Sequence, residues 1–225
     1  MHVVALFGNA QVLLFNIGIC LFASNKNVVF DNFRNVVNAA GRFASAISTG
    51  IVGCCALYCT LKHPTFDHTI SDIEVHTAKL FLGYILGDFI VILISSCVGD
   101  SSHISTYIHH IMCAFASGYC IVTKDPDDLR TSIRVMLFEL STPFLNTTFI
   151  LRKLNSTYES TFLCLTWVLF LVFRMVNGVV IIRELIARAS IWLYFMCCFF
   201  LLNVAWFVKL TLYVIRPNRT NIKKA

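Results

Sequence analysis

Charged residues are scarce in this chain: only 13% of its 225 residues are aspartate, glutamate, lysine or arginine. A soluble domain usually contains about a quarter of such residues. Hydrophobic residues make up 57% of the chain, and its mean hydropathy is +0.75. These values exclude an ordinary soluble domain and predict an all-α, polytopic membrane protein. The net charge of +6 is then expected to set topology and contact anionic headgroups, with no nucleic acid as partner.

The chain also lacks internal repeats, linkers and low-complexity tracts, which favours one membrane domain. Without an inverted repeat, a transporter is a weak interpretation. Seven histidines, mostly in loops, are too few for the histidine boxes of membrane desaturases and hydroxylases. The ten cysteines lie almost entirely in apolar runs, so we expect buried, reduced thiols. No metal site and no required cofactor are predicted.

Seven segments are long enough to cross the roughly 30 Å hydrocarbon core as helices, which takes about 20 apolar residues. They are residues 3–23, 36–60, 76–98, 105–123, 129–151, 160–182 and 189–215. The first lacks a basic n-region and contains Asn9, Gln11 and Asn16, so we expect an uncleaved transmembrane helix and no signal peptide. Asp128 is the expected N-cap of the fifth helix.

Alternate loops of a seven-helix chain fall on opposite sides of the membrane. One side carries more basic residues, namely Lys26, Arg34, Arg152, Lys153, Arg216, Arg219, Lys223 and Lys224. The other side has chiefly Lys62, Lys124, Arg130, Arg183 and Arg188. The positive-inside rule therefore predicts a cytosolic C-terminus and a lumenal N-terminus.

Two adjacent histidines, His109 and His110, lie inside the segment 105–123. Ionisable side chains in a span are costly and by default face the protein interior or a wet cavity. Neighbours on a helix diverge by about 100°, whereas two metal ligands on one helix need a spacing of three or four residues. A metal site is therefore a poor explanation for the pair.

The third segment brings a carboxylate to the same depth. Gly83 and Gly87 form a small-xxx-small pair that predicts a close helix contact. Tyr84 and Asp88 lie on the adjoining strip, one turn apart. Asp88 is therefore a candidate partner for one histidine, as a structural ion pair or as a group that orients it.

Further polar residues share helix faces in the fifth and sixth segments. Glu139, Thr142, Pro143 and Asn146 fall on one face, and Pro143 is expected to kink that helix. Arg174 and Asn177 fall on one face of the next segment. Glu139 and Arg174 form either a structural ion pair or part of a site.

Two functional interpretations fit the histidine pair. In the first, one imidazole performs acid–base chemistry or carries an acyl group transiently, while its neighbour or Asp88 tunes it. In the second, the same side chains line a lipid-binding cavity and hold a headgroup without chemistry.

These residues, in this order, resemble the TLC-domain family, which includes the ceramide synthases and the translocating-chain-associated membrane proteins. The resemblance covers about residues 33–215. It rests on Gly83-Tyr84 with Asp88, His109-His110, the string Glu139-Leu140-Ser141-Thr142-Pro143-Phe144-Leu145-Asn146, and Phe173-Arg174. The string is most similar to the branch of TLC domain-containing protein 4.

The resemblance implies six helices forming a barrel around a lipid cavity, with an extra N-terminal helix outside it. In ceramide synthases the paired histidines transfer an acyl chain from acyl-CoA to a sphingoid amine, a role that would fall on His109 and His110. Those enzymes also carry a His-Asp-x-x-Asp motif, and residues 139–146 stand in its place here. We therefore expect an acyl-binding cavity but not ceramide synthase activity itself.

The resulting hypothesis has three regions: an N-terminal helix and loop (1–32), a TLC domain (33–215) and a basic tail (216–225). The predicted catalytic residues are His109, His110 and Asp88, and the predicted substrate-cavity residues are Tyr84, Glu139, Asn146, Arg174 and Asn177. Membrane lipids and a fatty acyl chain are the expected partners, with acyl-CoA as candidate co-substrate and the endoplasmic reticulum as location. The alternative is a non-enzymatic sensor or regulator of membrane lipid composition.

Overall fold

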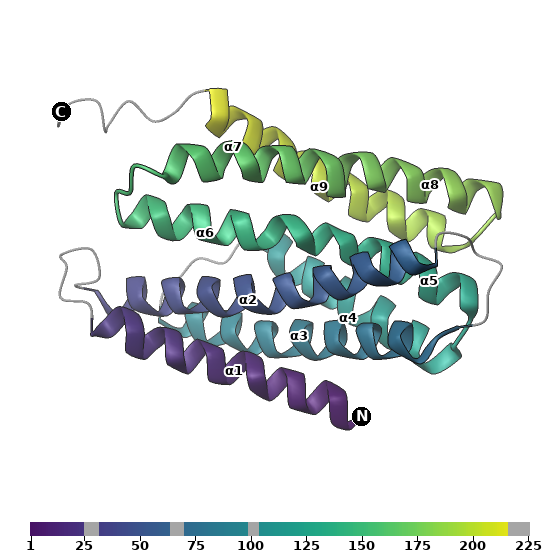
Figure 1. Cartoon of the computed structure of the whole chain (residues 1–225), viewed down its shortest axis with the longest axis horizontal. Coiled ribbons are helices and arrows are strands. Elements are labelled where there is room, and N and C mark those ends of the chain that lie inside the picture. The colour runs from purple at the N-terminus through teal and green to yellow at the C-terminus, as the bar shows by residue number, and fades with distance from the viewer. Residues whose placement is uncertain (25–31, 64–69, 99–103, 216–225) are drawn as a thin grey trace.

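The computed structural model describes residues 1–24, 32–63, 70–98 and 104–215, and within them it is helical with no strand (Figure 1). The elements, in order, are α1 (His2–Ala23), α2 (Phe33–Lys62), α3 (Asp72–Cys97), α4 (Ile104–Thr123), α5 (Pro126–Met136), the 3₁₀ segment η2 (Leu137–Ser141), α6 (Thr142–Lys153), α7 (Glu159–Phe170), the π-helical segment η3 (Leu171–Val176), α8 (Asn177–Ala187) and α9 (Trp192–Ile215). The helices run side by side along the long axis of the bundle (Figure 1).

Among the described residues, five helices are long and apolar enough to cross a membrane: α1, α2, α3, α9 and the continuous run Glu159–Ala187 that joins α7, η3 and α8. The other two predicted spans correspond to α4 and to the run from α5 through η2 to α6. Both are helical, but α4 carries the two histidines and the α5–α6 run carries several charges. Five spans are therefore supported by length and composition, where the sequence predicted seven.

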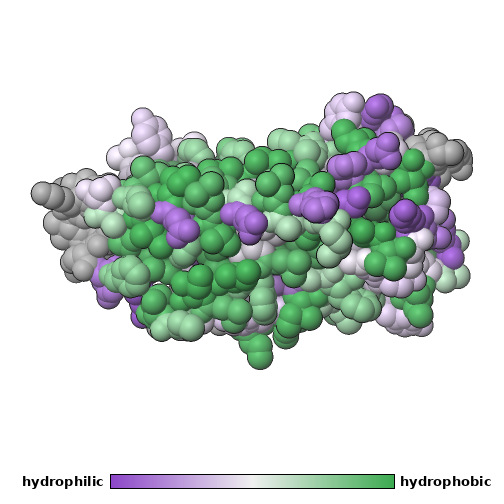
Figure 2. Space-filling model, turned by 90° about the horizontal axis from the view of Figure 1, so that it is seen from below, coloured by the Kyte–Doolittle hydropathy of each residue, from purple (hydrophilic) through white to green (hydrophobic). Residues whose placement is uncertain are grey.

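Large apolar side chains are exposed along these helices, including Leu6, Ile111, Phe115 and Leu201. Figure 2 shows hydrophobic residues covering much of one face, with hydrophilic residues concentrated toward one end. All ten cysteines lie in described residues and are free. The expectation that they are buried is only partly right, because Cys59, Cys113 and Cys120 are buried and five others are exposed.

Two irregular segments lie where the polar residues gather. Pro143 stands in the first turn of α6, and the preceding residues form the 3₁₀ turn η2, because proline cannot donate to the helix ladder and clashes with the carbonyl four residues before it. The predicted kink is thus a change of helix type. η2 packs against η3, a π-helical segment around Arg174 that the sequence analysis did not predict.

The start of α5 corrects a local expectation. Its N-cap is Asp125, whose Oδ1 accepts hydrogen bonds of 3.0 Å from the backbone N–H groups of both Asp127 and Asp128. Pro126 occupies the first helical position, where its missing N–H leaves no bond unmade. Asp128 therefore lies inside the first turn and its side chain is not the cap.

The predicted close contact at Gly83 and Gly87 is confirmed, and α1 is the partner. A Cβ on Gly83 would lie 2.6 Å from the carbonyl oxygen of Val4, and one on Gly87 would lie 2.8 Å from Cβ of Gln11. α1 packs on both α2 and α3 at one side of the bundle (Figure 1). Only glycine permits this approach, and it brings Gln11 into the protein interior.

We expect Gly83→Ala to destabilise the protein by about 1–3 kcal/mol, because the new methyl group has to displace a backbone atom of α1. Gly118→Ala is the matched control, since no atom lies within 4 Å of its added Cβ, and a helical Gly→Ala change on its own is neutral or slightly stabilising. Thermal unfolding in detergent measures both. Equal melting temperatures for the two variants would contradict the tight α1–α3 contact.

Candidate functional site

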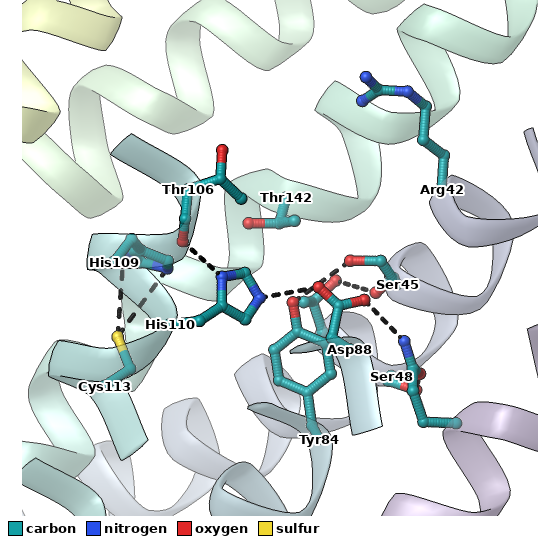
Figure 3. Close-up of polar contacts among 12 residues, drawn as sticks. Arg42, Ser45, Ser48, Tyr84, Asp88, Thr106, His109, His110, Cys113 and Thr142 are labelled. Atoms are coloured by element: carbon teal, nitrogen blue, oxygen red, sulfur yellow. Dashed lines mark hydrogen bonds and ion pairs between the residues drawn. The ribbon is translucent and has the colours of Figure 1, made fainter. Parts of the chain in front are cut away.

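The polar centre of the bundle is Asp88 of α3, whose two carboxylate oxygens have different partners. Oδ2 lies 2.8 Å from Nε2 of His110 on α4. Oδ1 accepts a hydrogen bond of 2.9 Å from Nε2 of Gln11 on α1. All three side chains are buried, and Figure 3 shows the carboxylate between the imidazole and an amide. The predicted pairing of Asp88 with a histidine is therefore present, and His110 is that histidine.

His110 uses both ring nitrogens. Its Nδ1 lies 2.9 Å from the backbone carbonyl oxygen of Thr106, one turn earlier on α4. A carbonyl oxygen can only accept, so Nδ1 carries a proton and donates it. The carboxylate of Asp88 is also an acceptor, so Nε2 carries a proton as well and donates it to Oδ2. The imidazole of His110 is therefore held in one orientation, with no nitrogen left for a substrate.

His109 has a different environment, made of rings and one thiol. Its imidazole stacks on Phe199 of α9, with ring centroids 5.2 Å apart, and meets the edge of Trp206 at 5.4 Å. The Sγ of Cys113 lies 3.8 and 3.9 Å from its two ring nitrogens. No oxygen or nitrogen among the described residues hydrogen-bonds to these nitrogens, so His109 retains the capacity to act on a ligand.

Tyr84 belongs to the same polar centre. Its hydroxyl lies 3.2 Å from Oγ of Ser45 on α2, and both side chains are buried. Tyr84 precedes Asp88 by one turn of α3, as the sequence predicted, and Figure 3 shows the phenol beside the carboxylate. Helices α1 to α4 thus each contribute a polar side chain to one cluster.

A second buried cluster surrounds Arg174 of η3. Thr142 lies between Arg174 and Glu139: its Oγ1 accepts from NH2 of Arg174 at 2.7 Å and donates to Oε2 of Glu139 at 2.9 Å. Glu139 and Arg174 therefore interact through the hydroxyl of Thr142, which hydrogen-bonds to both. The other guanidinium nitrogens donate to Oγ of Ser141, the carbonyl oxygen of Phe138 and Oδ1 of Asn203.

Asn146 and Asn177 lie apart from both clusters. Oδ1 of Asn146 accepts a hydrogen bond of 3.3 Å from Arg42, which Figure 3 shows away from the Asp88–His110 pair. Nδ2 of Asn177 donates to the carbonyl oxygen of Arg134 at 2.9 Å. Both amides bond to neighbouring helices in the described structure.

A cavity of about 50 Å³ lies between α3, α4, α5, α8 and α9. Its walls are mainly apolar or aromatic, with Phe81, Trp192, Phe195, Met196 and Phe199 among them. Cys113 and Phe199 also contact His109, so one end of the cavity adjoins that imidazole. None of the five predicted substrate-cavity residues lines it.

Ser117 is the unusual polar residue of this cavity. It is 1% exposed, and its hydroxyl has no hydrogen-bond partner among the described residues. At the other end, the partly exposed Asp128, Ser132 and Trp192 line the cavity near the turn between α4 and α5. The cavity therefore combines apolar walls, one unpaired hydroxyl and a polar end.

The spacing of residues on α4 also indicates this face in the sequence. His109, Cys113, Ser117 and Cys120 are spaced by four, four and three residues, which places them on one side of a helix. Gln11 was noted only as a polar residue in a span, and nothing local indicated that it meets Asp88. Among the described residues no group of three or more histidine, cysteine or acidic side chains is arranged to hold a metal.

Comparison with known families gives one match. The family model for the TLC domain matches residues 38–212, a range that starts within α2 and ends within α9. Comparison with curated proteins gives no significant match. The matched range includes Asp88, both histidines and the cavity, and it leaves out α1 with Gln11.

Proposed function

This chain belongs to the TLC-domain family, and from that membership we propose that it binds a fatty acyl chain in the cavity beside His109. The family and the five apolar helices fit a multi-pass membrane protein of lipid metabolism or regulation. The observation that carries the proposal is the shared wall: Cys113 and Phe199 line the cavity and also contact His109.

The pre-formed space is smaller than a full acyl chain, since about 15 Å³ of such space is what one water molecule needs. α4 and α9 lack the close backbone approach that joins α1 to α3. We propose that the acyl chain parts these two helices as it enters. The chain can lie in either of two orientations. In one, its polar head lies near Asp128 and Ser132, and in the other its carbonyl end lies near His109.

The geometry favours different roles for the two histidines. His109 is the proposed acid–base group or acyl carrier, and His110 with Asp88 positions the helix turn that holds it. With acyl-CoA as co-substrate, a ring nitrogen of His109 forms a bond to the thioester carbonyl carbon, and the C–S bond breaks. The imidazole proton leaves with the CoA thiol. The hydroxyl or amine of an acceptor lipid then forms a bond to the acyl carbon, the bond from that carbon to the imidazole nitrogen breaks, and the acceptor's proton returns to the imidazole.

One observation favours the alternative, a lipid sensor without chemistry. The partly exposed end of the cavity lies at the α4–α5 turn, whereas Arg152 and Lys153 lie at the far end of α6 (Figure 1). Arg152 and Lys153 are thus distant from the entrance, and Arg188, which donates to Thr131 of the cavity wall at 2.9 Å, is already paired with Asp127 at 3.6 Å. A lipid sensor does not need a route by which CoA reaches the histidines.

The finer architecture follows the family. We propose that α4 and the α5–η2–α6 run also cross the membrane, giving seven spans, and that six of them form a barrel. The branch of TLC domain-containing protein 4, the endoplasmic reticulum, a lumenal N-terminus and a cytosolic C-terminus are part of the same proposal. Residues 1–32 would precede the TLC domain (33–215), and the tail 216–225 lies outside the described residues.

Ser117→Phe tests the binding site, because the ring would fill the cavity. We expect it to reduce the acyl lipid that co-purifies with the full-length protein by about tenfold, equivalent to about 1.4 kcal/mol. Mass spectrometry of extracted lipids measures the amount per chain.

Gly118→Phe is the control, since this neighbouring position points into open space and the change should leave the lipid content unaltered. If Ser117→Phe does not fold, Ala116→Leu fills the same cavity with a smaller side chain. Unchanged lipid in a folded cavity-filling variant would overturn the proposal.

A further inference from the structure

Gln11 is fully buried, with 0% of its surface exposed, although α1 is a largely apolar helix. A buried amide has to find hydrogen-bond partners, because an unpaired polar group in the interior is destabilising. Its Nε2 donates to Oδ1 of Asp88 at 2.9 Å. Its Oε1 accepts a short hydrogen bond from the hydroxyl of Ser48 on α2.

The carboxylate of Asp88 determines which way the amide of Gln11 points, and Ser48 holds the amide in that place. A carboxylate oxygen can only accept, so the NH₂ group is turned toward Asp88. The hydroxyl of Ser48 then donates its one proton to Oε1. The flipped amide would place two acceptor oxygens, Oε1 of Gln11 and Oδ1 of Asp88, against each other.

The consequence for Asp88 is that its carboxylate cannot rotate freely. Oδ1 is held by Gln11, so Oδ2 is left for Nε2 of His110 at 2.8 Å. Together with the Nδ1 contact to the Thr106 carbonyl, the hydrogen bonds form a continuous chain from Ser48 to Thr106. It runs through α2, α1, α3 and α4, and Figure 3 shows Ser48, Asp88, His110 and Thr106 of this chain in one region.

We propose that Gln11 is a positioning residue for the Asp88–His110 pair, and that α1 is thereby a required part of the site although it lies outside the matched TLC domain. The close approach at Gly83 and Gly87 holds α1 where this contact forms. Any effect of the Asp88–His110 pair on His109 rests on the proposed function. The positioning of Asp88 by Gln11 does not rest on it.

A simpler role for Gln11 is a hydrogen bond that only joins helices. The two roles differ in their effect on His110. A helix-joining bond can be lost without changing the imidazole, whereas loss of the positioning contact frees Asp88 to rotate and weakens the hydrogen bond that holds the proton on Nε2 of His110.

Nitrogen-15 NMR of histidine-labelled, full-length protein in nanodiscs tests this directly. In the wild type we expect one form of His110, with a proton on both ring nitrogens, because both face acceptor oxygens. Gln11→Leu is expected to lose this single form and to give a mixture in which Nε2 has partly lost its proton. Asn16→Leu, an exposed amide on the same helix, is the matched control and should retain the wild-type spectrum.

Ser48→Ala supplies the second variant, and it decides the question if Gln11→Leu does not fold. It should change the His110 signal in the same direction, and it should add nothing in a Gln11→Leu background, because both act through one chain of bonds. A folded Gln11→Leu or Ser48→Ala protein with the wild-type His110 spectrum would overturn the proposal.

The outcome is separable from the proposed function. If Gln11→Leu alters His110 but no acyl transfer occurs in any variant, the positioning role stands and the acyltransferase proposal fails. If transfer occurs and the spectrum is unchanged, only the role of Gln11 is rejected.

Discussion

Replacing His109 by phenylalanine is expected to reduce acyl transfer from a long-chain acyl-CoA at least about 100-fold, the contribution of a positioned acid–base group, while leaving the fold intact. Phenylalanine keeps the ring that stacks on Phe199 and removes only the nitrogens. Transfer is measured by mass spectrometry of the protein and of the lipid products.

Unlike His109→Phe, the substitution His110→Phe is expected to lower the stability of the fold. It leaves the carboxylate of Asp88 buried without its imidazole partner, and breaking a buried pair in this way costs about 3–5 kcal/mol. We expect a large drop in thermal unfolding temperature for His110→Phe and little change for His109→Phe. Equal effects of the two substitutions on both stability and transfer would contradict the proposal that His109 reacts and His110 has a positioning role.

Arg174→Met is expected to destabilise the protein by about 3–5 kcal/mol, because it removes the charge that organises a buried network. The guanidinium bonds to side chains of η2, α6 and α9, namely Ser141, Thr142 and Asn203. Methionine restores the volume of the stem but none of these bonds.

Arg183→Met is the matched control for Arg174→Met, since Arg183 is exposed and its replacement should change stability by less than about 0.5 kcal/mol. Unfolding in detergent, followed by intrinsic fluorescence, measures both variants. An Arg174→Met protein as stable as the Arg183→Met protein would show that the Arg174 network is not what holds η2 and η3 together.

Much of the helical layout could be predicted from the sequence. Each of the seven predicted segments corresponds to a helix or a continuous helical run, because long apolar stretches have few other ways to satisfy their backbone groups in lipid. The close contact at Gly83 and Gly87 also followed from spacing on one helix face. Asp88 was a candidate partner for a histidine because both ionisable groups lie at the same depth in their segments.

The rest depends on which faces meet, and spacing on one helix carries no information about that. Asp88 pairs with His110 and not His109 because α3 meets the Thr106–His110 side of α4. Thr142 separates Glu139 from Arg174 because η2 and η3 change the rotation of their helices. The contribution of Gln11 required knowing that α1 packs on α3.

The cavity was the least predictable feature for the same reason. The analysis looked for a polar lining and selected the costly residues, which in the structure satisfy one another. The cavity lies along the face of α4 that carries Cys113, Ser117 and Cys120. Its other walls are mainly apolar or aromatic, which suits a lipid chain.

The most direct measurement is photo-crosslinking of the full-length protein in nanodiscs with a diazirine-bearing fatty acid, followed by peptide mapping. The account predicts adducts on α4 between Cys113 and Cys120 and on α9 around Phe195 to Phe199. Adducts confined to outward-facing residues such as Leu201 and Val208, which are exposed, would mean that the fatty acid contacts only the protein's outer surface and would contradict an acyl chain bound beside His109.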